Sequence, residues 1–143
     1  MQTDSSRDAL EVSARFALIP TTAAFADAFC ARHAIERAVA LRLRLVIEEL
    51  FTNTVNHGYG GESDAVIRIA LALDDGDLVL QYEDAAPAFD PRERWSAPPA
   101  GLDQSVDDRP VGGLGVHLVG ELVRDARYSR EAGRNRLTLV VRG

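Results

Sequence analysis

The chain has 143 residues, of which 46% are hydrophobic and 27% charged, which is typical of one globular domain and unlike a disordered or membrane protein. Its formal net charge of −6 disfavours direct binding to nucleic-acid phosphates. It contains one cysteine and no lysine, which excludes an internal disulfide, a Walker A phosphate loop and lysine-based catalysis.

The first half of the chain predicts an edge strand followed by two helices. Residues 1–9 form a polar tail, and apolar residues alternate with polar ones over residues 10–18, as in an edge strand. Pro20 then opens a helix that ends near residue 35. A second helix is predicted over residues 36–57, with Gly58 as its C-terminal stop.

The second half predicts four strands and a third helix. In chain order, we expect strands at 66–73 and 78–82, a helix at 115–123, and strands at 126–129 and 137–141. Tight turns are predicted at 74–77 and 132–135. Strands that follow one another through tight turns imply a mostly antiparallel mixed sheet, and three helices can cover only one of its faces. The fold class is therefore an α/β two-layer sandwich.

A connection of residues 85–111 separates the two predicted hairpins and holds five of the six prolines. Loops this long are uncommon in compact domains, where they serve as lids, binding loops or disordered linkers. We favour a lid over a plain insertion. Residues 92–109 are then expected to be mobile without a ligand and ordered with it.

A polar strip follows the edge of the second helix. At about 100° per residue, Glu49, Asn53 and Asn56 lie beside a predicted apolar stripe, whereas Glu48 points away. The stripe is formed by Val39, Leu43, Val46 and Leu50. A carboxylate and an amide oxygen suit a site for Mg²⁺ and phosphate, in which Glu49 can accept a proton. Polar residues also flank many amphipathic helices without binding anything, so both interpretations stay open.

Asp84 and a glycine cluster add two ambiguous features. Asp84 ends the return strand on the face that meets the helices, where it can bind an adenine amino group or the backbone of a turn. Gly112, Gly113 and Gly115 precede the third helix, whose free N–H groups can hold phosphate. The same glycines are also compatible with a flexible hinge.

The order of these motifs resembles a known family. The motifs are EELFTNTVNHGY (48–59), EDAAPAFDP (83–91) and DRPVGGLGVHLV (108–119). They resemble the N, G1 and G2 boxes of the GHKL ATPases, and in particular the stand-alone anti-sigma-factor serine kinases, to which the ending RYSREAGRNRLTLVVR is also similar. The resemblance implies the Bergerat fold, with residues 10–143 as one ATP-binding kinase domain and the long loop as its ATP lid.

The resemblance also implies site residues. Glu49 matches the general base for phosphorylating a serine, Asn53 matches the Mg²⁺ ligand, and Asp84 matches the residue that reads adenine. The expected ATP-binding positions are Asn53, Asn56, Asp84, Ala86, Arg109, Gly113, Leu114 and Gly115. Arg109 lies where a lid arginine senses the terminal phosphate, and Gly113 and Gly115 match the glycines beside the phosphates.

Ala86 departs from the family, whose G1 box has a glycine two residues after its aspartate. If the turn needs a left-handed backbone there, alanine costs on the order of 1–2 kcal/mol. Its methyl group can also crowd the base. Ala86→Gly is therefore predicted to tighten ATP binding roughly tenfold.

The sequence shows neither an apolar run long enough to span a membrane nor a signal-peptide pattern, so a cytoplasmic protein is expected. The resemblance implies an anti-sigma-factor serine kinase. It would bind Mg²⁺ and ATP, phosphorylate a serine of a STAS-type anti-anti-sigma protein and sequester a sigma factor, while homodimer formation stays open. No contact with membrane or nucleic acid is expected. A non-catalytic, ATP-gated binding module is the alternative, since Ala86 departs from the family. The ATPase part of a sensor histidine kinase is disfavoured because no phosphoacceptor hairpin precedes Leu10.

Overall fold

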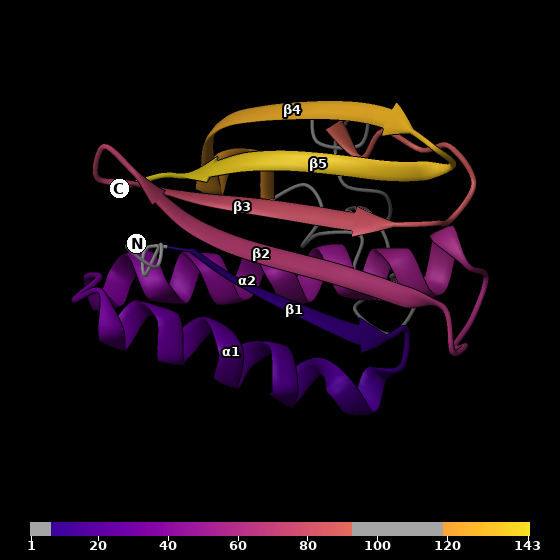
Figure 1. Ribbon diagram of the computed structural model, residues 1–143, viewed down its shortest axis with the longest axis horizontal. Helices are drawn as coiled ribbons and strands as arrows, with labels where there is room; N and C mark the ends of the chain where they lie inside the picture. Colours follow the sequence, from indigo (N-terminus) through magenta and orange to yellow (C-terminus); the bar gives the residue numbers. More distant parts are fainter. Residues whose placement is uncertain (1–6, 93–118) are drawn as a thin grey trace, which may run out of the picture.

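A five-stranded sheet forms one layer of the protein (Figure 1). The computed structural model describes residues 7–92 and 119–143. The strands are β1 (Arg7–Ser13), β2 (Val66–Asp74), β3 (Asp77–Asp84), β4 (Val123–Glu131) and β5 (Arg134–Val141). Their order in the sheet is β1-β2-β3-β5-β4, and the four pairings among these strands are antiparallel. The predicted sheet and its edge strand β1 are confirmed.

Two long helices lie together on one face of this sheet (Figure 1). They are α1 (Ile19–Arg32) and α2 (Arg37–Asn53), and a π-helical turn, η2 (Thr54–Gly58), continues α2. A short 3-10 turn, η1 (Phe16–Leu18), precedes α1. Residues 119–122 are also helical and fall within the third helix predicted at 115–123, whose first four residues lie outside the described ranges, whereas Val123 already belongs to β4. The two-layer α/β sandwich is therefore confirmed.

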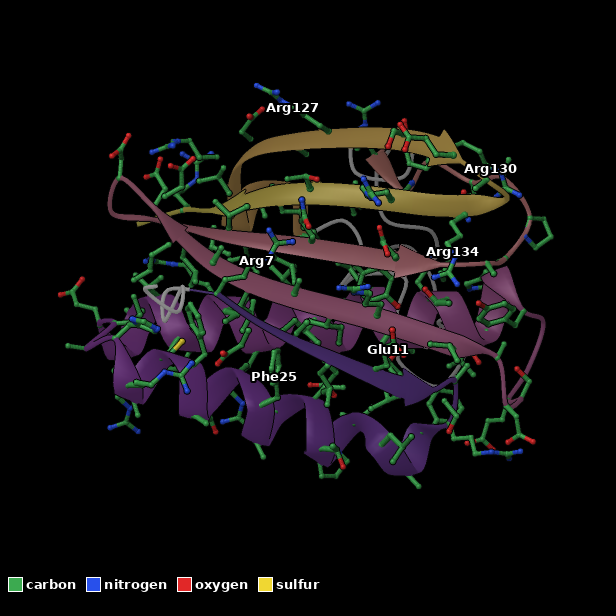
Figure 2. All side chains as sticks on the ribbon, viewed as in Figure 1. Arg7, Glu11, Phe25, Arg127, Arg130 and Arg134 are labelled. Carbon is green, nitrogen blue, oxygen red and sulfur yellow. The ribbon has the colours of Figure 1, made fainter. Side chains whose placement is uncertain are left out.

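The core lies between the helices and the inner face of the sheet. The predicted apolar stripe of α2, Val39, Leu43, Val46 and Leu50, is buried. It packs in one cluster with alternate strand residues, which include Ile67, Ile69, Leu71, Leu80 and Leu139. The outward positions carry exposed polar side chains such as Arg7, Glu11 and Arg127 (Figure 2). The alternation along the strands thus fixes which side chains reach the helices.

Several predicted strand boundaries were wrong, including both ends of β4, which was predicted at 126–129, and two of them have clear local reasons. β1 ends at Ser13 instead of residue 18, because the chain turns there and the η1 turn follows. β5 begins at Arg134 because the turn before it holds only Ala132 and Gly133, with φ of 52° and 77°. Two residues with positive φ form the hairpin turn that best matches the twist of a sheet, so the strands extend further than the apolar pattern.

The described residues include no helix that is long and apolar enough to cross a membrane.

Candidate functional site

A pocket opens where the C-terminal end of α2 meets the ends of β3 and the β4–β5 hairpin. Its walls come from α2 and η2, from β3 and the loop that follows it, and from the hairpin. The lining residues are Leu50, Asn53, Thr54, Gly58, Tyr82, Asp84, Ala86, Phe89, Pro91, Tyr128, Asn135 and Leu137. Of the predicted site residues, Asn53, Asp84 and Ala86 are brought together here. Segments that are far apart in the sequence therefore build one site.

The π-helical turn changes the predicted polar strip. The backbone N–H of Tyr59 donates to the carbonyl of Thr54 at 2.8 Å, which is an i to i+5 bond. Such wide turns are rare in proteins, and those that occur are often found at functional sites. Asn56 lies within this turn, is half-buried and is not among the lining residues. The prediction applied the α-helical rotation of about 100° per residue to Asn56 as well, but the π-helical turn that begins at Thr54 rotates less per residue.

Asp84 is held by a hydrogen-bond network from α2 and β3. Its side chain is 8% exposed, and the hydroxyl of Thr54 donates to its Oδ2 at 3.1 Å. The Thr54 hydroxyl also lies 3.0 Å from the Leu50 carbonyl, and the Tyr82 hydroxyl donates to that carbonyl at 3.1 Å. One hydroxyl carries one proton. The Leu50 carbonyl also accepts the backbone N–H of Thr54, and the hydroxyls of Thr54 and Tyr82 lie 2.7 Å apart. The proton of the Thr54 hydroxyl can therefore point to Asp84 Oδ2 while the Leu50 carbonyl keeps a donor.

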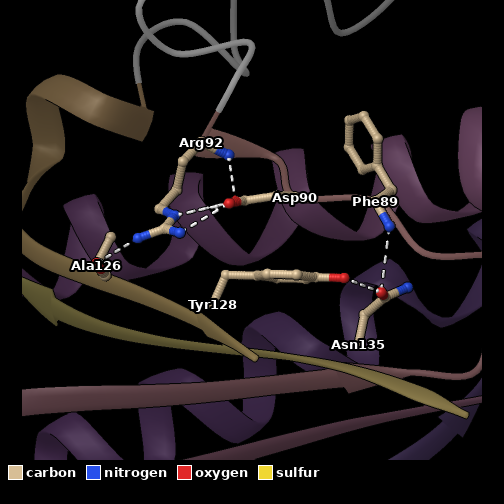
Figure 3. Close-up of polar contacts among 6 residues, drawn as sticks. All are labelled: Phe89, Asp90, Arg92, Ala126, Tyr128 and Asn135. Atoms are coloured by element: carbon tan, nitrogen blue, oxygen red, sulfur yellow. Dashed lines mark hydrogen bonds and ion pairs between the residues drawn. The ribbon is translucent and has the colours of Figure 1, made fainter. Parts of the chain in front are cut away.

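Asn135 joins the hairpin to Asp84 and to the loop after β3. Its Nδ2 donates to Asp84 Oδ1 at 2.8 Å and lies 3.1 Å from the carbonyls of both Ala86 and Pro87. Its Oδ1 accepts from the Tyr128 hydroxyl at 2.6 Å and from the Phe89 backbone N–H at 3.2 Å (Figure 3). A single amide thus orients the carboxylate and fixes the loop beside it.

Two arginines also tie this loop to β4. Arg130 donates to the carbonyl of Ala86 at 2.7 Å. Arg92 pairs with Asp90 at 2.8 Å and donates to the carbonyl of Ala126 at 3.3 Å (Figure 3). Burial opposes the charge on Asp90, but the hydrogen bonds from Arg92 outweigh it and lower the pKa of this carboxyl. The wall of the pocket that carries Phe89 is therefore anchored at both ends.

Ala86 does not adopt the backbone conformation that the sequence comparison suggested. The described non-glycine residues with positive φ are Ala34, Asp75 and Ala132, so no left-handed strain arises at Ala86. Its side chain is 1% exposed, and it faces a glycine across the pocket wall. A Cβ atom placed on Gly58 would lie 3.1 Å from the Cβ of Ala86. The missing side chain at Gly58 thus leaves room for the methyl group of Ala86.

Glu49 lies on α2 one helical turn before Asn53 and is half-buried. Within the described residues its Oε2 atom is buried and has no hydrogen-bond partner. Burial, and to a smaller extent the neighbouring Glu48, raises the pKa of Glu49. Buried polar atoms are normally hydrogen-bonded, so an orphaned carboxylate oxygen with a raised pKa is a candidate proton acceptor.

The predicted lid and phosphate positions lie outside the described residues. These positions are Arg109, Gly113, Leu114 and Gly115, together with most of the proposed lid, 92–109.

Sequence reasoning missed four polar residues of the site. Thr54, Tyr82, Tyr128 and Asn135 line the pocket, although Asn135 was predicted to lie in a turn. A signal was available for Asn135, because it shares the period-two pattern of the buried residues Leu137 and Leu139. A polar residue in a buried register needs partners, which marks it as a site candidate.

Comparison with known proteins places the chain in a family. A family model described as "Histidine kinase-like ATPase domain" matches residues 12–141. The chain belongs to this family. The serine/threonine-protein kinase BtrW of Bordetella bronchiseptica is 30% identical over 140 residues, which are 95% of this chain and 94% of that protein. The serine-protein kinase RsbW of Listeria monocytogenes is 26% identical over 92 residues, which are 64% of this chain and 59% of that protein.

Solved structures share the fold. The RsbU and RsbW domains of a Mycobacterium tuberculosis protein superpose with a TM-score of 0.63 at 22% identity, covering 95% of this chain and 32% of that one. A chain of the SiaB–SiaC complex of Pseudomonas aeruginosa gives a TM-score of 0.64 at 13% identity, covering 94% and 88%. The predicted resemblance to the anti-sigma-factor kinase branch is confirmed by this set of relatives.

Proposed function

We propose that the protein binds Mg²⁺ and ATP, phosphorylates a serine of a STAS-type anti-anti-sigma protein and sequesters a sigma factor. The observation that carries the proposal is the orphaned, half-buried carboxylate of Glu49 one turn from Asn53. Its relatives are named serine/threonine-protein and serine-protein kinases, and the protein is accordingly a serine/threonine kinase of this family.

The lining of the pocket supports binding of an adenine base. Asp84 accepts three of the roughly four hydrogen bonds open to a carboxylate, two at Oδ1 and one at Oδ2. Oδ2 therefore keeps one acceptor position for an amino group of the base. Apolar walls from Leu50, Leu137 and Phe89 suit the faces of a flat ring.

Asn53 supports the proposed Mg²⁺ site beside this pocket. The buried side chain of Asn53 lines the pocket and offers an amide oxygen, the ligand type that Mg²⁺ accepts alongside its waters. When bound, Mg²⁺ supplies positive charge that stabilises the phosphoryl group in transfer. The role of Asn53 is then to hold this charge beside the phosphates. Asn56, Arg109, Gly113, Leu114 and Gly115 remain proposed phosphate-side residues.

Glu49 performs the proton transfer in this proposal. Its carboxylate accepts the proton of the serine hydroxyl while the hydroxyl oxygen bonds to the terminal phosphorus and ADP leaves. A pKa raised by burial makes Glu49 a stronger base than an exposed carboxylate. The absence of left-handed strain at Ala86 removes one argument for the alternative, a non-catalytic ATP-gated module.

The partners are proposed from the relatives. The SiaB–SiaC complex of Pseudomonas aeruginosa joins a protein of this fold to a second protein, which supports a protein partner for this chain. The STAS-type substrate, the sigma factor and a homodimer are extensions of the family resemblance. A sigma-factor partner implies a cytoplasmic site of action.

The test is phosphotransfer with a matched pair of variants. The purified protein is incubated with Mg²⁺, γ-labelled ATP and the STAS protein encoded nearest to it. Wild type should label a serine, whereas Glu49→Gln should bind ATP normally and lose about 10²–10⁴-fold in rate. Glu48→Gln alters the exposed neighbour and should stay near the wild-type rate. ATP binding without any transfer by wild type would instead establish the non-catalytic module.

A further inference from the structure

The proposed adenine end of the pocket contains two buried hydroxyl groups that the phosphoryl transfer does not use. Thr54 is 5% exposed and Tyr82 is 4% exposed, and both residues line the pocket. Their hydroxyl oxygens lie 2.7 Å apart, and the oxygen of Thr54 lies 3.1 Å from Oδ2 of Asp84. Buried hydroxyl groups cost free energy unless they are paired, so their position against a buried carboxylate indicates a role in holding it.

The proton of the Thr54 hydroxyl has two acceptors within reach. The Leu50 carbonyl lies at 3.0 Å and the Asp84 carboxylate at 3.1 Å. The Leu50 carbonyl already accepts the backbone N–H of Thr54 and lies 3.1 Å from the hydroxyl of Tyr82, which can donate to it. A carbonyl oxygen has two lone pairs, and a charged acceptor forms the stronger hydrogen bond. The Thr54 hydroxyl therefore donates to Asp84.

The direction of this hydroxyl is fixed by the other branch of the Thr54 side chain. A Cβ atom placed on Gly58 would lie 3.6 Å from the Cγ2 atom of Thr54, so the methyl group lies on the side of the glycine. Because both branches start from Cβ, threonine has few χ1 rotamers, and a rotamer that exchanges the branches would put the methyl group against the carboxylate. Thr54 thus holds its donor toward Asp84 before any ligand binds.

Thr54 also determines where the carboxylate can accept a further hydrogen bond. Oδ1 of Asp84 accepts from the side chain of Asn135 at 2.8 Å and from the backbone N–H of Ala86 at 3.2 Å, which fills its two acceptor positions. Among the hydrogen bonds of the described residues, the one from Thr54 is the bond at Oδ2. It prevents the carboxylate from turning about χ2 and fills one of the two positions on Oδ2. One acceptor position with a fixed direction remains.

We propose that Thr54 is the positioning residue that sets the preference of this site for a purine with a 6-amino group. By holding Oδ2, it directs the open acceptor position toward an amino donor. A purine with hydrogen at position 6 leaves the charged oxygen unpaired, and a purine with a 6-oxo group places two acceptors against each other. The inference rests on the nucleotide binding in the proposed function and extends it to the choice of base.

The test compares two variants that both lack the Thr54 methyl group. Thr54→Ala also removes the hydroxyl, whereas Thr54→Ser keeps it. Calorimetry in Mg²⁺ gives the Kd for ATP and for purine riboside triphosphate, which carries hydrogen in place of the 6-amino group. Wild type should prefer ATP by about 100-fold, the difference made by one hydrogen bond to a charged group. Thr54→Ala should lower this preference at least tenfold through weaker ATP binding, and Thr54→Ser should keep it within threefold.

Thr52→Ala is the matched control, because Thr52 is half-buried on the same helix and outside the pocket lining. It should keep the wild-type preference. All three substitutions remove at most two side-chain heavy atoms, and alanine favours the helix, so the variants should fold.

Three results would overturn the role of Thr54. One is an unchanged preference in Thr54→Ala. A second is an equal loss of affinity for both nucleotides, which would make Thr54 a support of the pocket as a whole. The third is the same loss in Thr54→Ser, which would assign the effect to the methyl group. If wild type binds neither nucleotide, the proposed function fails and this inference fails with it, whereas ATP binding without phosphoryl transfer contradicts only the kinase proposal.

Discussion

Asn135→Asp tests the network that holds Asp84. The substitution keeps the shape of the side chain but replaces the donor Nδ2 by an oxygen. That oxygen then lies 2.8 Å from Asp84 Oδ1. Where wild type has a hydrogen bond, the variant has two acceptors facing each other, and the Ala86 and Pro87 carbonyls lose their donor as well. The variant therefore exchanges one attractive contact for several repulsive ones.

The loss of folding free energy in the variant depends on whether both carboxylates stay ionised or one of them binds a proton. The possibility with the smaller loss determines the stability. Two charges at this distance repel by about 6 kcal/mol at an effective dielectric constant of about 20. The pair can instead bind one proton, which costs about 5 kcal/mol at pH 7.5 for a carboxyl with an unfolded pKa of about 3.9. Binding a proton costs slightly less free energy than the repulsion, so the folded variant holds one proton between the two carboxyl groups. The cost then falls to about 1.5 kcal/mol at pH 5, plus about 1 kcal/mol for the lost donor at any pH.

The direction in which the variant's stability changes with pH follows from proton linkage. The shared carboxyl has a higher pKa in the folded than in the unfolded state, so the folded variant binds more protons between about pH 4 and pH 7.5. Its stability is therefore greatest at low pH and decreases by about 1.4 kcal/mol per pH unit as the pH rises, relative to wild type. A loss of about 6 kcal/mol at pH 7.5, the sum of both costs, is comparable with the whole stability of many domains, so the variant should fold at pH 5 and largely unfold at pH 7.5.

Urea unfolding of wild type and variant at half-unit steps from pH 4.5 to 7.5 measures this slope. Asn56→Asp is the matched control, because Asn56 is half-buried and outside the pocket lining, and it should show no additional slope. Equal pH dependence in Asn135→Asp and wild type would refute the placement of Asn135 against Asp84.

Three further substitutions test the rest of the site. Asn53→Ala should abolish Mg²⁺-dependent ATP binding in calorimetry while the variant stays folded, and unchanged affinity would remove Asn53 from the site. Ala86→Gly should lower the free energy of unfolding by about 1–2 kcal/mol, from a lost buried methyl group and a more flexible chain. Because Ala86 carries no left-handed strain, its ATP affinity should stay within about threefold, and a tenfold gain by titration would show that the methyl group crowds the base. Glu49→Gln should be more stable than wild type at pH 7.5, since burial raises the pKa of Glu49 above its ordinary 4.5 and the folded wild type carries that cost only when ionised. The difference in unfolding free energy between Glu49→Gln and wild type should vanish below pH 4.5. A difference that does not depend on pH would contradict the raised pKa of Glu49.

Periodicity alone identified the elements of the fold that have a strong pattern. The alternation in β2 and β3 and the apolar stripe of α2 predicted both the elements and their buried faces, because a side chain's direction follows from the local helix or strand geometry. The same reasoning put Asp84 on the inner face of β3, and it is buried there. Motif order then indicated the family, since the boxes keep their sequence and spacing.

Contacts between distant segments were decided only by the tertiary structure. The sequence placed Asn135 in a turn, and no local rule links it to Asp84, 51 positions away. The π-helical turn that moves Asn56 off the polar strip follows α2, where the Thr54 hydroxyl meets Tyr82 and Asp84 from β3. The sequence showed that Ala86 replaces a glycine of the family motif. Only the structure shows that the space for its methyl group comes from Gly58 on another segment. Local geometry determines which way a side chain points, whereas packing of the whole chain determines what it meets.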